Sequence, residues 1–110
     1  LAGRNDELLA RLGRLAARYP GQILPLGFTT TIERVMAAAD LAITKPGGLT
    51  TSECLAMQLP MIVVSHNLQH VFRISDRILV MRQGRLAAQL VTSETTPEEV
   101  VAYITGAKAA

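Results

Sequence analysis

The chain has 110 residues, a net charge of +2 and a hydrophobic fraction of 49 %, with aromatic residues making up only 4 %. This length suits one domain with an aliphatic core that buries roughly 65 % of the unfolded surface. Acidic and basic residues are mixed along the chain, which argues against a nucleic-acid-binding stripe. No apolar run approaches the ~20 residues of a membrane span. Cys54 has no second cysteine with which to form a disulfide, so we expect a reducing, cytoplasmic compartment. From the lack of a long apolar run we expect no membrane contact.

The first predicted helix covers residues 6–18, with Asn5 as its cap and Pro20-Gly21 as its end. Four apolar side chains recur on one face at helical spacing, and we expect this face to be buried. They are Leu8, Leu12, Leu15 and Tyr19. The arginines near this helix are interpreted as its solvated side. They are Arg4, Arg11, Arg14 and Arg18.

Strands and helices then alternate. A short strand at 22–26 precedes a helix that Thr30 and Glu33 open as a capping box and that runs through Ala38. An apolar strand at 41–44 leads into a loop with two glycines. The next helix is predicted to run from about residue 51 to residue 58.

Residues 61–65 form an apolar run without alternation, which is typical of a strand buried on both faces of a parallel sheet. A helix at 67–75 and a strand at 77–81 follow. Each is short and is bounded by polar residues. The pattern is that of a parallel sheet with helical crossovers.

Gln83-Gly84 predicts a hairpin turn into an antiparallel edge strand at 86–91. Thr96-Pro97 predicts the start of the last helix, because proline suits the first helical position, and Gly106 ends it. With a strand stub at 1–3, this order implies one three-layer α/β sandwich over residues 1–110.

The segment 45–53, Lys-Pro-Gly-Gly-Leu-Thr-Thr-Ser-Glu, carries the main functional signal. Gly47 and Gly48 leave the backbone uncrowded, and the helix that follows offers unpaired N–H groups and a positive dipole end. This arrangement suits a phosphate or a nucleotide diphosphate. A structural role is the alternative, with the glycines forming a tight turn and Thr50 and Glu53 forming a capping box.

Four motifs follow one another with family-like spacing in residues 1–64. They are Ala-Gly-Arg-Asn at 2–5, Leu-Gly-Phe-Thr at 26–29, the stretch 38–53 that contains the glycine loop, and Leu-Pro-Met-Ile-Val-Val at 59–64. Together they resemble the donor-binding half of GT-B glycosyltransferases of the monogalactosyldiacylglycerol-synthase type.

This resemblance implies roles for the residues of the glycine loop. Gly47, Gly48 and Thr50 would approach the donor diphosphate, and Glu53 would bond the ribose hydroxyls. Phe28 would flank the base, although a place in the core is an alternative for this residue.

Residues 62–106 carry a different set of motifs. They are Ile-Val-Val-Ser-His-Asn-Leu-Gln-His-Val-Phe at 62–72, Ser-Asp-Arg-Ile-Leu-Val-Met-Arg-Gln-Gly-Arg-Leu at 75–86 and Thr-Thr-Pro-Glu-Glu-Val-Val-Ala-Tyr-Ile-Thr-Gly at 95–106. This set resembles the C-terminal end of a sugar-importer ABC-transporter ATPase, in which His66 would match the switch histidine. Because the chain has no G-x-x-x-x-G-K-[ST] phosphate loop, His66 is interpreted as a surface or capping residue.

The glycosyltransferase family has a further strand between those that correspond to residues 1–3 and 41–44. Its absence here would make these two strands neighbours. The expected sheet is then flavodoxin-like, of order 2-1-3-4-5, with an added antiparallel edge strand. In residue numbers the order is 23–26, 1–3, 41–44, 61–65, 77–81 and 86–91.

Two unrelated resemblances meet in the strand at 61–65. We therefore interpret the chain as an engineered chimera of a glycosyltransferase-like segment, 1–64, and an ATPase-like segment, 65–110. As a designed scaffold it would be a monomer or homodimer with no enzymatic activity and no cofactor. Two alternatives stay open: a weak UDP or phosphate site at Gly47, Gly48, Thr50 and Glu53, and a fragment of a nucleotide-sugar glycosyltransferase.

Overall fold

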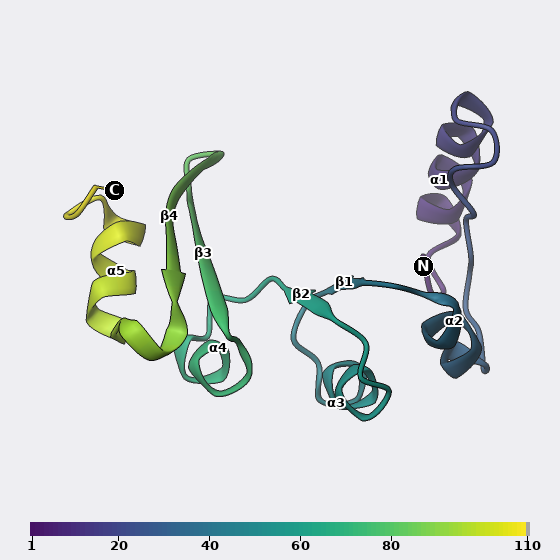
Figure 1. Cartoon of the computed structure of the whole chain (residues 1–110). Helices are drawn as coiled ribbons and strands as arrows, with labels where there is room; N and C mark the ends of the chain where they lie inside the picture. The colour runs from purple at the N-terminus through teal and green to yellow at the C-terminus, as the bar shows by residue number, and fades with distance from the viewer. Residues whose placement is uncertain (110) are drawn as a thin grey trace. The chain divides into compact units, whose positions relative to one another are not determined.

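The computed structural model of the chain describes residues 1–109, apart from the side chains at positions 48 and 49. Helices and strands alternate from α2 (Ile32–Ala38) to β3 (Arg77–Arg82) (Figure 1), which confirms the predicted α/β class. The residues group into two compact units. The first comprises Leu1–Ala42 and Leu49–Met61, and the second comprises Ile43–Gly48 and Ile62–Ala110. Within residues 1–109, no helix is long and apolar enough to cross a membrane.

Helix α1 (Asp6–Arg18) has the bounds that the sequence predicts. The Asn5 side-chain oxygen Oδ1 accepts a hydrogen bond from the Leu8 N–H at 2.9 Å, and two acidic residues stand at the positive end of the helix dipole. No residue of α1 is buried in the described chain. The predicted burial of its apolar face is therefore not observed.

The segments 1–3 and 22–26, predicted to be strands, form no strand in the structure. One backbone hydrogen bond joins them, from the Ala2 N–H to the Leu26 carbonyl at 2.7 Å. Pro25 has no N–H to donate and Gly3 turns away from the extended region with a φ of +58°, so the pairing in the described structure is limited to this bond. Without strands here, α1 has no sheet to cover. The described residues form two two-stranded sheets, and the predicted single sheet of order 2-1-3-4-5 is not observed.

Strands β1 (Ala42–Thr44) and β2 (Met61–Val63) pair with each other. The Ala42 N–H donates to the Pro60 carbonyl and the Val64 N–H donates to the Thr44 carbonyl, both at 2.9 Å. The partner residue advances with the chain, so the pair is parallel, as predicted. Ile62 and Val64 are 44 % and 66 % exposed, so the prediction that both faces of this strand are buried is wrong in the described structure.

The core of the first unit is formed by α2 (Ile32–Ala38), α3 (Gly48–Ala56) and the segment that follows α3. Its buried residues are Met36, Cys54 and Leu59, against which Ile32, Ala39, Ala42 and Met61 pack. The capping box predicted for Thr30 and Glu33 is wrong, because α2 begins at Ile32 and its N-cap, Thr31, makes no side-chain cap. Instead, the Thr31 N–H donates to the Thr29 hydroxyl at 3.0 Å.

The second unit is built on an antiparallel hairpin of β3 (Arg77–Arg82) and β4 (Arg85–Val91), which confirms that prediction. Gln83 and Gly84 have φ values of 50° and 75°, and two positive values are what a type I′ turn requires. The short 3₁₀ helix η1 (Thr92–Glu94) and α5 (Pro97–Thr105) follow.

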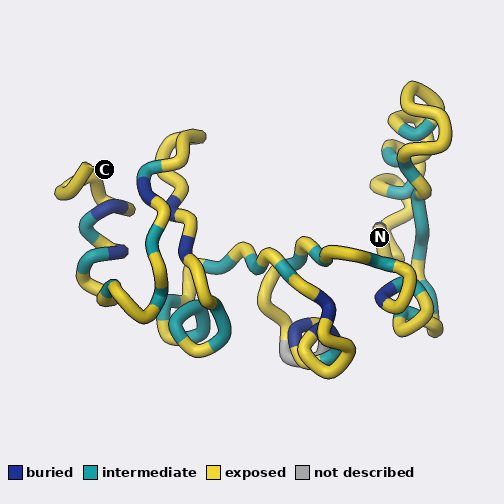
Figure 2. The backbone as a smooth tube through the Cα atoms, viewed as in Figure 1, coloured by how far each residue is buried: buried dark blue, intermediate teal, exposed yellow. Residues whose placement is uncertain are grey.

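The core of the second unit consists of buried residues of β3, β4 and α5, drawn dark blue in Figure 2. They are Ile78, Val80, Ala88, Val100 and Tyr103. Helix α4 (Leu68–Ile74) adds Leu68, Val71 and Phe72 to this cluster. The alternation of buried and exposed residues along β3 matches a strand with one covered face.

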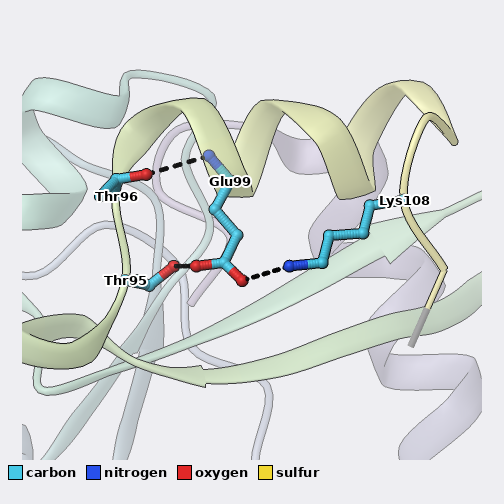
Figure 3. A network of polar contacts seen from close by, with 4 residues as sticks. All are labelled: Thr95, Thr96, Glu99 and Lys108. Carbon is cyan, nitrogen blue, oxygen red and sulfur yellow. Dashed lines mark hydrogen bonds and ion pairs between the residues drawn. The ribbon is translucent and has the colours of Figure 1, made fainter.

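Side chains also fix the two ends of α5 (Figure 3). Thr96 accepts a hydrogen bond from the Glu99 N–H at 3.2 Å and so caps the first turn. The Glu99 carboxylate accepts from Lys108 Nζ at 2.8 Å and from the Thr95 hydroxyl at 2.7 Å. These bonds, that from Lys108 foremost, hold the pKa of Glu99 below its usual value, and Glu99 in turn raises the pKa of Lys108.

Candidate functional site

The glycine loop connects the end of β1 at Thr44 to the start of α3 at Gly48. The Thr44 hydroxyl donates to the Lys45 carbonyl at 3.0 Å. Gly47 is exposed, and a Cβ added to it would meet no atom within 4 Å, so the space beside its Cα is unoccupied. The predicted site residue Gly48 lies outside the residues whose surroundings are described.

Thr50 and Glu53 lie on α3, three residues apart, so they share one side of the helix. Thr50 is exposed and Glu53 is half-buried, whereas Thr51 and Cys54 are buried. Because α3 begins at Gly48, Thr50 is the third helical residue and does not occupy the N-cap position. The capping box of Thr50 and Glu53 is therefore wrong, and this structural explanation no longer accounts for the two side chains.

Glu53 lines an open groove of about 310 Å³ in the first unit. The groove walls come from α2 and from α3 with the residue that follows it, and most of them are apolar. They are Ile32, Glu33, Met36, Glu53, Ala56 and Met57. The core contact of Met36 with the α3 side of the unit holds the two helices and so positions the Glu53 carboxylate at the groove.

Phe28 is 57 % exposed, so its alternative place in the core is wrong. It borders a second hollow of about 170 Å³, also in the first unit. The lining residues are Leu1, Gly3, Gly27, Phe28, Thr29 and Ile32. Ile32 lines both the hollow and the groove.

The guanidinium of Arg4 lies over the Phe28 ring, with Cζ 4.1 Å from the ring centroid. The prediction that Arg4 belongs to the solvated side of the first helix did not include this contact. One sequence signal could have separated Arg4 from the other arginines, because Arg4 lies in the Ala-Gly-Arg-Asn motif before the helix begins.

In the described part of the chain, neither His66 nor His70 belongs to a group of side chains that could hold a metal ion. His66 is exposed, and the neighbouring Asn67 caps α4 by accepting from the His70 N–H at 3.2 Å. Within residues 1–109, no group of three His, Cys, Asp or Glu side chains could hold a metal ion. The chemistry available at this site is thus that of binding by backbone N–H groups, a hydroxyl, a carboxylate and an aromatic ring.

Parallel strands and a glycine loop at a helix start are features of nucleotide-binding α/β domains. The sequence model of the glycosyltransferase family 28 C-terminal domain matches residues 7–73, and the chain belongs to this family. A processive diacylglycerol beta-glucosyltransferase of Staphylococcus carnosus is 34 % identical over 94 % of the chain. That of Bacillus licheniformis is 36 % identical over 57 % of the chain.

The resemblance to sugar-importer ATPases is also confirmed. A fructose import ATP-binding protein of Rhizobium meliloti is 42 % identical over 46 % of the chain and is itself covered over 19 % of its length. The chain spans 28 % and 16 % of the two glucosyltransferases, so it corresponds to a part of each. No solved structure matches the chain.

These matches correct the interpretation of the chain as an engineered scaffold without activity. The family match runs to residue 73, through β2 and most of α4, and so passes the expected junction after residue 64. The similarity to the Staphylococcus carnosus enzyme covers nearly the whole chain. The prediction that the chain is not an enzyme is wrong for the same reason, because its family is one of glycosyltransferases.

Proposed function

We propose that the chain forms the donor-nucleotide-binding part of a glycosyltransferase that transfers glucose from a nucleotide sugar to diacylglycerol. The similarity to the Staphylococcus carnosus processive diacylglycerol beta-glucosyltransferase over 94 % of the chain carries this proposal. Because the chain spans 28 % of that enzyme, the acceptor site and the complete reaction belong to the longer protein. The donor in this proposal is a UDP-sugar.

The diphosphate of the donor binds at the glycine loop. The openness around Gly47 supports this role, since backbone can approach phosphate oxygens only where no side chain intervenes. Gly48 and Thr50 stand in the first turn of α3, where N–H groups lack helical partners and the dipole favours negative charge. Transfer of the sugar leaves a full additional charge on the UDP leaving group, and donors aimed at that charge favour the reaction.

The nucleoside lies along the first unit, with its ribose at Glu53 and its base at Phe28. The half-buried Glu53 carboxylate faces a groove with mostly apolar walls, where bonds from ribose hydroxyls are less screened than in open water. The exposed Phe28 ring offers a stacking surface. Ile32 borders both places and would pack against the nucleoside between them.

We also propose that the chain folds as one domain in the complete protein, with the flavodoxin-like order 2-1-3-4-5 and an added antiparallel edge strand. The bond between Ala2 and Leu26 and the parallel pairing of β1 with β2 support two steps of this order. Two further steps, pairing of residues 1–3 with 41–44 and of residues 61–65 with 77–81, have no counterpart among the strand pairs of the described residues. Backbone NOEs between the two segments of each pair would support the order, and their absence in a well-folded sample would contradict it.

Titration with UDP, followed by the backbone amide NMR shifts of the chain, tests the donor site. We expect saturable shifts at Gly47, Gly48 and Thr50 and none in α5, which serves as the internal control. Inorganic phosphate should shift the loop amides but leave Glu53 and Phe28 unaffected. No loop shifts at millimolar UDP would refute the proposal.

A further inference from the structure

The contact between Arg4 and Phe28 joins two segments that are far apart in the sequence. Arg4 Cζ lies 4.1 Å from the centroid of the Phe28 ring, well within the distance of a cation–π interaction. Phe28 is more than half exposed, at 57 %, so packing alone does not fix its ring. The guanidinium is therefore a main restraint on this side chain.

Short backbone contacts hold Arg4 at this place. The Asn5 N–H donates to the Ala2 carbonyl at 3.1 Å, which closes a turn with Gly3 and Arg4 at its centre. Asn5 then caps α1 through the Leu8 N–H, so the residue after Arg4 is tied to the helix. The bond from Ala2 to Leu26 keeps this turn beside the segment that carries Phe28.

Close approach of the two backbones supports the same arrangement. A Cβ added to Gly27 would lie 3.3 Å from Leu9 Cδ2 and 3.6 Å from the Gly3 carbonyl oxygen. The residue before Phe28 thus lies against both α1 and the turn that carries Arg4. The contacts of Gly27 and the bond from Ala2 to Leu26 hold the backbones of Arg4 and Phe28 near each other, and the two side chains are in contact.

Arg4 and Phe28 differ in their relation to the hollow. Phe28 is one of its lining residues, together with Gly3 and Gly27, whereas Arg4 is not. The guanidinium occupies one face of the ring at a distance that leaves no room for a base between them, because two stacked layers need about 7 Å. A base on Phe28 therefore uses the other face.

We propose that Arg4 is a positioning residue for the nucleotide base: it braces one face of Phe28 so that the opposite face is presented to the hollow for stacking. This inference rests on the proposed function, since it assumes that Phe28 receives the base. It assigns to Arg4 an action through Phe28 and no contact with the ligand. The contribution of Arg4 is the pre-ordering of a ring that would otherwise lose rotamer freedom when the base binds.

Uridine is the appropriate probe, because it lacks phosphate and so excludes direct attraction between Arg4 and the diphosphate. Its affinity is measured by NMR titration for the unchanged chain and for Arg4→Ala, Phe28→Ala and the double variant. We expect Arg4→Ala to weaken uridine binding about two- to fivefold, the size of an exposed cation–π contact. In the Phe28→Ala background the same change should have no effect. Arg11→Ala, which removes one exposed charge from α1, is the matched control and should leave the affinity unchanged.

A loss from Arg4→Ala that persists without Phe28 would overturn the inference and indicate direct contact with the ligand. An unchanged affinity of Arg4→Ala, where Phe28→Ala weakens binding, would overturn it as well. If uridine does not bind and UDP shifts only the glycine loop, the base assignment itself fails together with the inference, while the diphosphate site stands. The Phe28 ring proton shifts provide a second readout, since they must change in Arg4→Ala before any ligand is added.

Discussion

Replacing Glu53 with alanine removes the carboxylate that we assign to the ribose hydroxyls of the donor. A hydrogen bond to a charged group contributes about 1.5–3 kcal/mol. Glu53 is half-buried in a groove with mostly apolar walls, so solvent screens this bond only in part. We count one such bond and assign no energy to a second bond, which solvent screens. The Glu53→Ala change should then weaken UDP binding about 10- to 150-fold.

Isothermal titration with UDP measures this loss directly. Glu33→Ala is the matched control, because Glu33 lines the same groove and carries the same charge but has no assigned role. Its affinity for UDP should stay within about twofold of the unchanged chain, the range of a weak, screened interaction. The reasoning is refuted if Glu53→Ala binds UDP as well as the unchanged chain does. It is also refuted if the same loss appears with 2′,3′-dideoxy-UDP, which has no ribose hydroxyls to bond.

Three further predictions concern stability. Gly106 has a φ of +83°, and an added Cβ would meet the Arg82 guanidinium at 2.7 Å. Gly106→Ala should therefore lower the free energy of unfolding, measured in urea titrations, by about 1–2 kcal/mol. Gly13→Ala, in mid-helix with open space around it, should raise it by about 0.5–1 kcal/mol, and equal effects of the two changes would contradict this account. Val100 is 1 % exposed, so Val100→Ala should cost about 2 kcal/mol, and a loss of under about 0.5 kcal/mol would show that the α5 core is looser than described. Because the pKa of Glu99 is lowered, its contribution to stability is full at neutral pH and is lost as the pH falls below the ordinary glutamate value of about 4.3. Because the pKa of Lys108 is raised, its contribution is lost as the pH rises above the ordinary lysine value of about 10.4. Thermal unfolding of Glu99→Gln should show neither loss, and an unchanged pH profile would rule out this contribution.

Local signals in the sequence were sufficient for the elements that rely on local chemistry. The cap at Asn5, the proline after Thr96 and the turn at Gln83-Gly84 each act within a few residues, and the structure has α1, α5 and the hairpin where they predict them.

Elements that depend on distant partners were predicted less well. The stub at 1–3 and the segment 22–26 need neighbouring strands, and Pro25 limits their pairing to one bond. At the candidate site, the predicted start of α3 is three residues later than the observed start at Gly48. The later start was favoured because Thr50 and Glu53 match the pattern of a capping box. The exposure of Phe28 and its contact with Arg4 involve residues 24 positions apart in the chain, and no local pattern signals such a contact.

Binding of UDP and ATP, compared side by side by calorimetry on the same chain, tests the central claim most directly. The chain resembles both glucosyltransferases and ATP-binding proteins, and the two nucleotides differ in base and in phosphate number. We expect saturable binding of UDP at one site, with ATP at least tenfold weaker, a difference of about 1.4 kcal/mol. Tighter binding of ATP than of UDP would contradict it.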